Sequence, residues 1–308
     1  MLDSDLLDFI ADDGMDVEES RNVPPVTFYE DVCRCLCCTL SFVPSIRKYF
    51  INHWEILPKY PLRVLLGMTL CYLYTIFYAQ PRLDNLPGFV FWFAYITSLI
   101  GNCAYVLTIT SGPGYLPFYY PMEINQERDF LSGIAITPEQ QMFAHRKKIP
   151  RAKFFRSARR IVICPDHFCT WAATFIGRKN HKQFFLFCFW TCVSGFALIS
   201  IVVMVILKDF WEGRVLQLVL SCMFLVFVTS NVVFCLYQLI IKIINITHNQ
   251  TRFEKLVKEI PVKRPVLMNW EAIFGPINQW YKWPFPFPAF PSKKDDDLLE
   301  GLRTERLL

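Results

Sequence analysis

The sequence predicts an α-helical integral membrane protein with four transmembrane helices and a long polar loop between the second and the third. Hydrophobic residues make up 53% of the 308 residues and aromatic residues 16%, and the mean hydropathy is +0.28. Soluble domains contain about 45–50% apolar residues. The excess here is gathered in four segments, and the basic residues lie mainly outside them. The chain is therefore expected to place much of its apolar surface in lipid.

Each of the four segments has the length and composition of a membrane-spanning helix, which needs about 20 mostly apolar residues. They are residues 62–79, 89–110, 184–207 and 215–241. The last two contain no Asp, Glu, Lys or Arg. Buried helices of a large soluble protein are the alternative, and two uncharged runs of this length disfavour it.

The distribution of Lys and Arg predicts the orientation of these helices, because cytoplasmic flanks carry an excess of basic residues. Residues 111–183 contain twelve Lys or Arg, and residues 242–308 contain eleven. The short loop 80–88 contains one basic residue, Arg82, and the loop 208–214 contains two basic and two acidic residues. Both termini and the long middle loop are therefore expected in the cytosol, with the two short loops on the other side.

This topology divides the chain into five regions. They are a cytosolic N-terminal region (1–60), helices 1 and 2 (61–110), a cytosolic domain (111–183), helices 3 and 4 (184–241) and a cytosolic C-terminal region (242–308). The first 22 residues contain eight acids and one base, which predicts a disordered tail and no cleavable signal peptide; a sorting or partner-binding peptide is the alternative. Four cysteines before the first helix are either S-acylation sites or ordinary reduced thiols: Cys33, Cys35, Cys37 and Cys38.

Asp166, His167 and Cys169 stand within four residues, just before the third predicted helix. Cysteine reacts as its thiolate. A neighbouring imidazole takes the thiol proton, and a carboxylate orients the imidazole. These residues predict a nucleophilic thiol beside the bilayer, placed to attack a group that lipids or acyl-CoA supply. The basic middle loop could also suit nucleic acid, but its place between two helices favours lipid and CoA, so no nucleic-acid partner is expected.

Five further motifs accompany this core in a fixed order. They are 111–117 (SGPGYLP), 148–151 (KIPR), the set Trp171, Gly177 and Asn180, 249–254 (NQTRFE) and 269–275 (NWEAIFG). Together with the four helices, the chain from residue 61 to residue 275 resembles the DHHC protein S-acyltransferase (palmitoyltransferase) family, with DHFC in place of DHHC. The resemblance implies that the cytosolic loop between helices 2 and 3 is like the family's cysteine-rich domain.

The resemblance implies that the protein moves a long-chain acyl group from acyl-CoA to protein cysteines. Cys169 would attack the thioester of palmitoyl-CoA, with His167 as the base and Asp166 as the carboxylate that orients it. The acyl group would then pass to membrane-proximal cysteines of protein substrates at the cytosolic face of the bilayer. The family is typical of endomembranes, so the Golgi or endoplasmic reticulum is the expected location.

Lys148, Arg151 and Trp171 are the residues that the resemblance assigns to acyl-CoA binding. Lys148 and Arg151 match a family stretch that faces the CoA phosphates, and charge-assisted hydrogen bonds suit such a polyanion. The alternative is that these basic residues only mark the cytosolic side of the membrane and contact anionic lipids. Three further arginines share both interpretations: Arg156, Arg159 and Arg160.

The zinc sites of the family have no counterpart in this sequence. Family members hold two zinc ions with eight Cys and His residues, and none of the eight positions carries either residue here. They are Gln141, Ala144, Phe154, Phe155, Ala158, Ile161, Phe168 and Phe175. Zinc stabilises small domains, and burial of a large apolar side chain contributes about 1.5–3 kcal/mol. The sequence therefore predicts no zinc, and a hydrophobic cluster of the four Phe and Ile161 in its place.

Three other departures bear on activity: Thr170 in place of Pro, Thr174 in place of Asn and Arg252 in place of Thr. They leave open a second function, that of a catalytically inactive DHHC-like membrane scaffold or adaptor. An enzyme needs the Cys169 thiol, whereas a scaffold does not. A small transporter or channel is disfavoured, because predicted helices 3 and 4 carry no ionisable residue.

Overall fold

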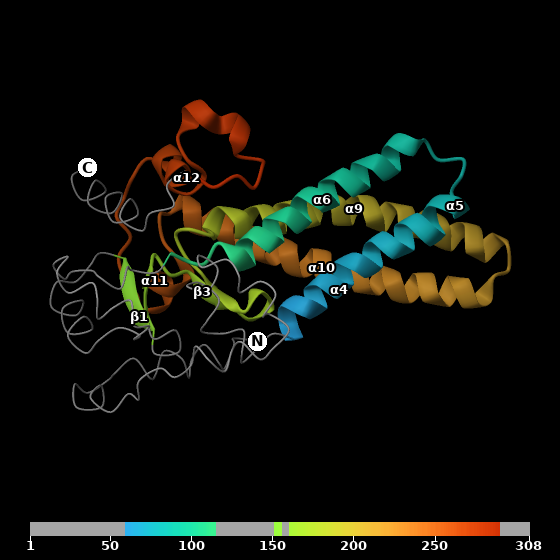
Figure 1. The fold of residues 1–308 in the computed structure, drawn as a ribbon, viewed down its shortest axis with the longest axis horizontal. Helices are drawn as coiled ribbons and strands as arrows, with labels where there is room; N and C mark the ends of the chain where they lie inside the picture. The colour runs from blue at the N-terminus through green and yellow to red at the C-terminus, as the bar shows by residue number, and fades with distance from the viewer. Residues whose placement is uncertain (1–58, 115–150, 156–159, 290–308) are drawn as a thin grey trace, which may run out of the picture.

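The computed structural model describes residues 59–114, 151–155 and 160–289, and it forms an elongated helical bundle with a small β-containing domain at one end (Figure 1). Several predicted features lie outside the described residues. They are the acidic tail, the cysteines from Cys33 to Cys38, Lys148, Gln141, Ala144, Arg156, Ala158 and Arg159, together with the side chains of Phe154, Arg160 and Ile161.

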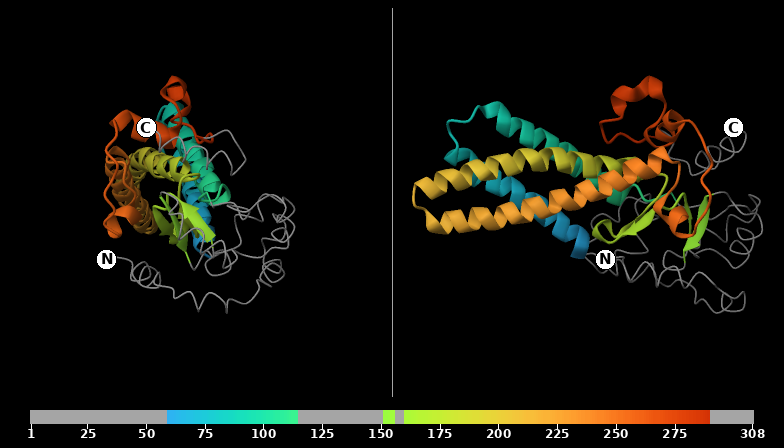
Figure 2. Two further views of the ribbon diagram at one scale, coloured as in Figure 1. Left: turned by 90° about the vertical axis from the view of Figure 1, so that its left-hand side faces the viewer. Right: turned by 180° about the vertical axis from the view of Figure 1, so that it is seen from behind.

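Four long helices confirm the predicted membrane fold. The first comprises α4 (Lys59–Tyr74), the π-helical turn η4 (Thr75–Ala79) and α5 (Gln80–Arg82). The others are α6 (Gly88–Thr110), α9 (His181–Trp211) and α10 (Val215–Thr247). All four are long and apolar enough to cross a membrane. Figure 2 shows α9 and α10 as an antiparallel pair that runs the full length of the bundle.

The end of the fourth helix differs from the prediction. The predicted helix stops at residue 241, before the first charged side chain, whereas α10 continues to Thr247. Lys242 and Asn245 are each 1% exposed. The charge at residue 242 therefore does not mark the exit into solvent, because the small domain covers this last part of the helix.

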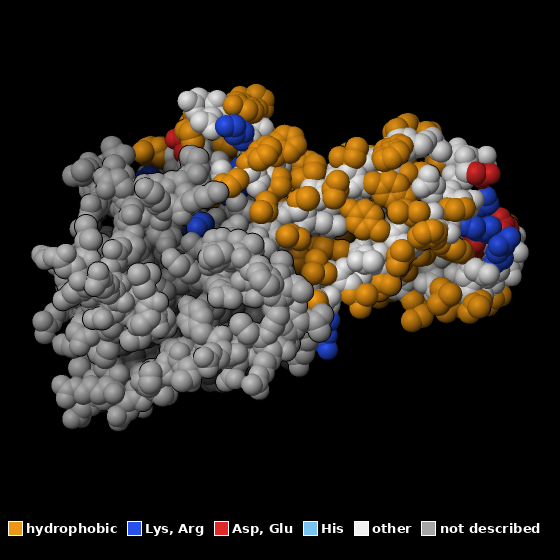
Figure 3. All heavy atoms as spheres, viewed as in Figure 1, with side chains coloured by type: hydrophobic (Ala, Val, Ile, Leu, Met, Phe, Trp, Pro, Cys, Tyr) orange, Lys and Arg blue, Asp and Glu red, His pale blue; other side chains and the backbone are white. Residues whose placement is uncertain are grey.

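Most of the apolar surface of the bundle faces outward. Between 11% and 33% of each span is buried within the protein, and hydrophobic side chains cover the visible face of the bundle (Figure 3). Such a surface is far larger than the apolar patches of soluble monomers. Inside the bundle, small residues bring the helices together: Gly195 of α9 lies against Val232 of α10, and Gly101 of α6 lies against Trp190 of α9.

The small domain consists of two antiparallel hairpins and the elements that follow α10. Strand β1 (Ala152–Phe155) pairs with β2 (Arg160–Ile163), and β3 (His167–Cys169) pairs with β4 (Thr174–Ile176) through the 3-10 turn η6 (Thr170–Ala172). The C-terminal elements are α11 (Arg252–Leu256), α12 (Val266–Phe274) and the 3-10 turn η7 (Ile277–Lys282). The strands lie at one end of the bundle, next to α11 (Figure 1).

Aromatic side chains form the core of this domain. Phe155, Phe175, Val162 and Phe253 are buried together, and Phe168 packs against them. The ring centroids of Phe155 and Phe175 are 4.5 Å apart, and those of Phe168 and Phe175 are 5.3 Å apart. The predicted cluster is thus present for its three described phenylalanines. Val162 and Phe253 belong to it as well, which the sequence analysis did not foresee.

At the opposite end of the bundle, a polar network joins the first and third helices. Asp209 of α9 is fully buried, and its carboxylate accepts hydrogen bonds from Tyr78 Oη at 2.6 Å and Arg82 Nη2 at 2.5 Å. Lys208 Nζ donates to the carbonyl of Arg82 at 2.6 Å. A nearby pair, Lys208 with Asp84 at 3.6 Å, has a largely exposed carboxylate.

We expect Asp209→Ala to lower the thermal unfolding midpoint of the detergent-solubilised protein, because Tyr78 and Arg82 would lose a buried acceptor. Leaving buried donors unpaired costs about 1–3 kcal/mol. Asp84→Ala is the matched control, since an exposed ion pair contributes about 0–1 kcal/mol. Fluorescence-detected size exclusion after heating measures the midpoint of each variant. Equal midpoints for the two variants would contradict the proposed importance of the buried network.

Candidate functional site

The hairpin β3–β4 carries the three residues predicted to react. His167 pairs with Ile176, Phe168 with Phe175 and Cys169 with Thr174. Because side chains alternate along a strand, His167 and Cys169 share one face, and Phe168 lies on the other face with the aromatic core. The hairpin turns at Ala173, which adopts a left-handed conformation with φ 48°. The register therefore places the imidazole and the thiol on the side that faces the bundle.

Asp166 precedes β3 and is 1% exposed. Its Oδ2 lies 2.6 Å from His167 Nδ1 and also contacts Lys242 Nζ, and its Oδ1 accepts a hydrogen bond from the backbone amide of Arg252 at 3.0 Å. Burial raises the pKa of this carboxyl, but Lys242 and His167 lower it by more, so the pKa of Asp166 lies well below its usual range. Asp166 is therefore an ionised acceptor.

His167 is held between this carboxylate and the bundle. Its ring packs edge to face on Phe184 of α9, with centroids 5.2 Å apart. Burial and the Lys242 cation lower the pKa of His167, and Asp166 opposes them. A hydrogen bond from Nδ1–H to Asp166 leaves Nε2 with its lone pair. The imidazole is thus neutral near pH 7 and suited to accept a proton at Nε2.

Cys169 is 8% exposed and lies in an apolar cluster with side chains of α6, α9 and α10. Burial raises the pKa of its thiol to about 11, while the backbone amides of Ala172 and Trp171 and the charge of Lys242 act in the opposite direction. The resting side chain is therefore a thiol, so attack on an electrophile requires a base that removes the proton as the new bond forms.

Lys242 is the residue of the site that the sequence analysis missed. It lies on α10, its side chain is 1% exposed, and its Nζ contacts Asp166 Oδ2 and lies 3.5 Å from His167 Nδ1. A single base directly after an apolar run looks like an ordinary cytosolic flank. The available signal was its spacing from Cys235 and Leu239, which puts all three on one face of a helix.

Residues 111–114, which follow α6, hold the two hairpins through backbone hydrogen bonds, and we call this segment the seat of the hairpins. The carbonyl of Gly114 accepts a hydrogen bond from the amide of Ile163, and that of Pro113 from the amide of Lys179. Gly112 and Gly114 have φ of 66° and 88°, a backbone conformation that glycine tolerates best. The predicted motif 111–117 therefore has a structural role in its described part: it joins the end of α6 to both hairpins.

Asn180 connects the same parts through its side chain. It is fully buried, accepts the Gly177 amide at 2.9 Å, and donates to the carbonyls of Phe175 at 2.9 Å and Thr108 at 3.2 Å. Tyr105 of α6 adds a hydrogen bond to the carbonyl of Trp171 at 2.8 Å. The position of Cys169 is thus fixed from both ends of its hairpin.

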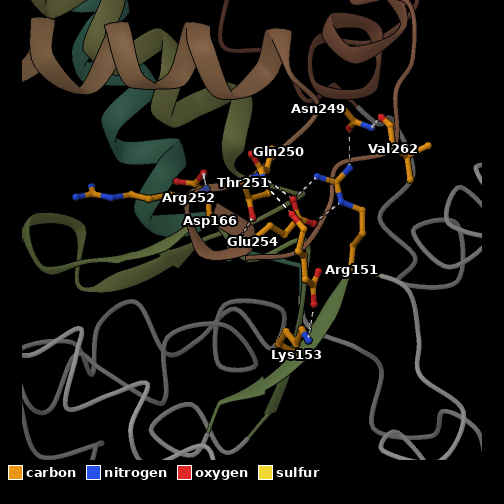
Figure 4. Close-up of polar contacts among 10 residues, drawn as sticks. Arg151, Lys153, Asp166, Asn249, Gln250, Thr251, Arg252, Glu254 and Val262 are labelled. Atoms are coloured by element: carbon orange, nitrogen blue, oxygen red, sulfur yellow. Dashed lines mark hydrogen bonds and ion pairs between the residues drawn. The ribbon is translucent and has the colours of Figure 1, made fainter. Parts of the chain in front are cut away.

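The motif 249–254 fastens α11 to the hairpins (Figure 4). Thr251 caps α11: its Oγ1 accepts the Glu254 amide at 3.1 Å, and Glu254 Oε2 accepts the Thr251 amide at 2.7 Å. Glu254 also forms two hydrogen bonds with the Arg151 guanidinium, at 2.7 and 3.0 Å. Arg252, one of the noted departures, contributes its backbone amide to Asp166, which any residue type provides.

The three predicted acyl-CoA contacts differ in placement. Arg151 Nη1 donates to Asn249 Oδ1 at 2.9 Å in addition to its Glu254 bonds, so its guanidinium is held in a fixed orientation. The Trp171 side chain is 45% exposed beside the buried Cys169, and its ring meets Phe234 of α10 at 6.3 Å. Lys148 is outside the described residues.

The residues present do not fit the family's zinc sites. Three of the eight ligand positions, Phe155, Phe168 and Phe175, are packed against one another and offer no donor atom. Within residues 59–114, 151–155 and 160–289, no three His, Cys, Asp or Glu side chains are grouped as metal ligands. The expectation of a zinc-free domain stays a prediction.

Comparison with known proteins confirms the family resemblance. Residues 137–259 match the family model described as DHHC palmitoyltransferase. Palmitoyltransferase ZDHHC7 of Mus musculus is 25% identical over 121 residues, which are 36% of this chain and 38% of that protein. Palmitoyltransferase AKR1 of Yarrowia lipolytica is 29% identical over 106 residues, 33% of this chain and 15% of that protein. Protein S-acyltransferase 10 of Arabidopsis thaliana is 30% identical over 81 residues, 24% of this chain and 23% of that protein.

The alignments therefore cover well under half of the length of these relatives. The residues matched by the family model include both hairpins, α9, α10 and α11. The matched region contains Asp166, His167, Cys169 and Lys242.

We expect Gly177→Ala to destabilise the domain, because an added Cβ would lie 2.5 Å from the carbonyl oxygen of Pro113 and 3.0 Å from that of Ile163. Pro113 belongs to the seat and Ile163 to β2, and both atoms are backbone atoms, so relief requires the hairpin to move, at a cost of about 1–3 kcal/mol. The measurement is the thermal midpoint. Gly88→Ala is the matched control, since no atom lies within 4 Å of its added Cβ. A Gly177→Ala midpoint equal to that of the control would refute the close approach.

Proposed function

Because residues 137–259 match the family model of DHHC palmitoyltransferases, we propose that this protein is a protein-cysteine S-acyltransferase that uses long-chain acyl-CoA. One observation carries the proposal: the Asp166 carboxylate holds His167 through a 2.6 Å hydrogen bond on the same hairpin as Cys169, at the end of a membrane bundle. Carboxylate, imidazole and thiol thus come from one hairpin and the residue before it, beside the helices that can cross a membrane.

The proposed first step forms an acyl-enzyme. His167 Nε2 takes the Cys169 proton as Sγ attacks the thioester carbonyl carbon of acyl-CoA. The carbon–sulfur bond to CoA then breaks, and the CoA thiolate takes the proton from His167. In the second step a substrate cysteine gives its proton to His167 and attacks the acyl-Cys169 carbonyl, and Cys169 leaves and is reprotonated. No other reactant is needed.

The surroundings of Cys169 support an acyl chain within the bundle. Its apolar cluster includes Tyr105 of α6, Phe184 and Cys188 of α9, and Cys235 of α10. We propose that the chain extends from Cys169 between these helices. Trp171 and Lys148 are proposed to contact CoA, and Arg151 to present its fixed guanidinium to the CoA phosphates.

The proposed topology places both termini, the domain 111–183 and the region 242–308 in the cytosol, on the membrane of the Golgi or endoplasmic reticulum. Substrates would be proteins with cysteines close to the cytosolic face of the bilayer. The surplus of bases around the domain supports this side, because cytosolic flanks are basic.

A membrane scaffold without catalytic activity is the second candidate. The observation in its favour is the Cys169 thiol itself, whose burial raises its pKa to about 11. A thiol that stays protonated at pH 7 is a poor nucleophile unless His167 removes its proton.

The labelling of Cys169 decides between these functions. In a background with Cys33, Cys35, Cys37 and Cys38 replaced by Ser, cells are fed a clickable palmitate analogue. We expect hydroxylamine-sensitive label on the protein, and its loss in Cys169→Ser and His167→Ala, because the thiol bonds to the acyl group and the imidazole activates the thiol.

Cys222→Ser is the control, because Cys222 is an exposed cysteine of α10 toward the other end of the bundle. Label that persists in both site variants, or that is absent from all proteins at equal expression, would establish the scaffold function instead.

We propose that the domain folds without zinc, so we expect a chelator to leave the protein intact. Elemental analysis of the purified protein is expected to give well below one zinc per chain, and the thermal midpoint is expected to stay constant in EDTA, because aromatic contacts hold the hairpins. Phe175→Ala, which removes a 1% exposed ring, is expected to cost about 3–5 kcal/mol. One or two zinc ions per chain, with unfolding in EDTA, would disprove the prediction.

A further inference from the structure

We propose that Lys242 of α10 is a positioning residue of the acyl-transfer site, which holds the Asp166 carboxylate and keeps His167 in the neutral form that accepts the Cys169 proton. The inference deepens the proposed function and rests on it. None of the predicted site residues comes from a membrane helix, so this role would connect the fourth helix directly to the chemistry.

Geometry places Lys242 within the group of reacting residues. Its Nζ contacts Asp166 Oδ2, the same oxygen that lies 2.6 Å from His167 Nδ1, and it is itself 3.5 Å from that nitrogen. One carboxylate oxygen is therefore shared by an ammonium and an imidazole. Ammonium has only donors, so Lys242 donates to this oxygen, and the 2.6 Å contact fits Nδ1–H donating to the same oxygen.

Burial makes the pair interdependent. The side chains of Lys242 and Asp166 are 1% and 0% exposed. A buried charge without a partner is costly, and removal of one partner leaves the other uncompensated. The Lys242 ammonium also lies 5.1 Å from the ring centroid of Phe184, whose face favours a cation. Phe184 in turn packs on His167, so one ring contacts both the ammonium and the imidazole.

The titratable and charged groups that face this centre come from several elements. The hairpin β3–β4 and the residue before it supply Asp166, His167 and Cys169. Arg151 directly precedes β1, His181 belongs to α9, and Arg252 belongs to α11. Among them, Lys242 is the cation in direct contact with Asp166 Oδ2. It therefore has the strongest effect on how much of the carboxylate's charge is available to His167.

The sign of this effect follows from the charges. Without Lys242, the Asp166 charge would act on His167 alone and would stabilise the imidazolium. His167 would then hold a proton up to a higher pH and would be unable to accept one from Cys169. The Lys242 cation also favours the thiolate of Cys169. The first effect of its removal moves the acid side of the pH–rate profile to higher pH, and the second lowers the rate.

The test compares Lys242→Gln and Lys242→Met, which remove the charge, with Lys242→Arg, which keeps it. Gln retains an N–H donor for Asp166, and Met retains the side-chain length. The initial rate of Cys169 acylation by palmitoyl-CoA is measured from pH 5.5 to 9 on purified protein in detergent, with the fraction folded taken from size exclusion. For the neutral variants we expect the acid limb to move up by about one pH unit, which is about a tenfold lower rate at low pH.

Lys242→Arg is expected to keep the acid limb of the pH–rate profile at the wild-type pH, even if its acylation rate is lower. Lys255→Met, which removes an exposed base of nearby α11, is the control for a general change in charge and should leave the profile unchanged. Folded neutral variants with the wild-type profile would overturn the proposal. So would loss of folding in both neutral variants, because Lys242 would then have a structural role only.

A second readout separates this inference from the proposed function. The rate of Cys169 alkylation by iodoacetamide against pH, followed by mass spectrometry, reports the thiolate without any acyl transfer. If the wild-type protein is not acylated, the proposed function fails. In that case, a limb shifted upward in Lys242→Gln still supports the effect of Lys242 on the site, whereas an unshifted limb overturns it.

Discussion

The described structure depends on the interactions of one buried group, the carboxylate of Asp166. Its side chain binds His167, Lys242 and the amide of Arg252, while its backbone amide donates to the carbonyl of Ile176 and its carbonyl accepts the amide of Phe253. These partners come from the β3–β4 hairpin, from α10 and from α11. A charge in such a place is tolerated only when it is paired and fully hydrogen-bonded. The need to satisfy one carboxylate therefore fixes the hairpin against a membrane helix.

Metal ions and aromatic contacts stabilise a small domain in different ways. A zinc ion fixes the directions of four ligands, whereas apolar packing is non-directional. The cluster around Phe175 supplies burial but does not by itself aim a side chain. In this protein the directional constraints come from hydrogen bonds at the edges: Asn180 ties the hairpin to α6, and Arg151 with Glu254 ties β1 to α11. These hydrogen bonds fix the hairpin that carries His167 and Cys169 through protein groups alone.

Hydropathy alone predicts the four helices, because lipid imposes the same length and composition on every span. Asp166, His167 and Cys169 are also apparent as candidate reacting residues, since they stand within four residues of the sequence. Lys242 and the true end of α10 are different. Hydropathy takes the first charge after an apolar run as the point where the helix meets water, but here a carboxylate 76 positions earlier in the chain provides the solvation. Likewise, the seat formed by Pro113 and Gly114 depends on contacts across sequence that no local pattern encodes.

Burial has opposite consequences for the resting site and for the reacting one. It keeps Cys169 protonated and His167 neutral, which works against a preformed thiolate–imidazolium pair. The same exclusion of water strengthens every interaction of the charges once they form. Proton transfer from Cys169 to His167 creates one negative and one positive charge at a centre that already contains Asp166 and Lys242. The net charge of the buried site stays the same through this proposed step, so the cost of the transfer depends on how the four charges are placed. That placement depends on Lys242, so the proposed reaction would require α10, a membrane helix, as part of its site.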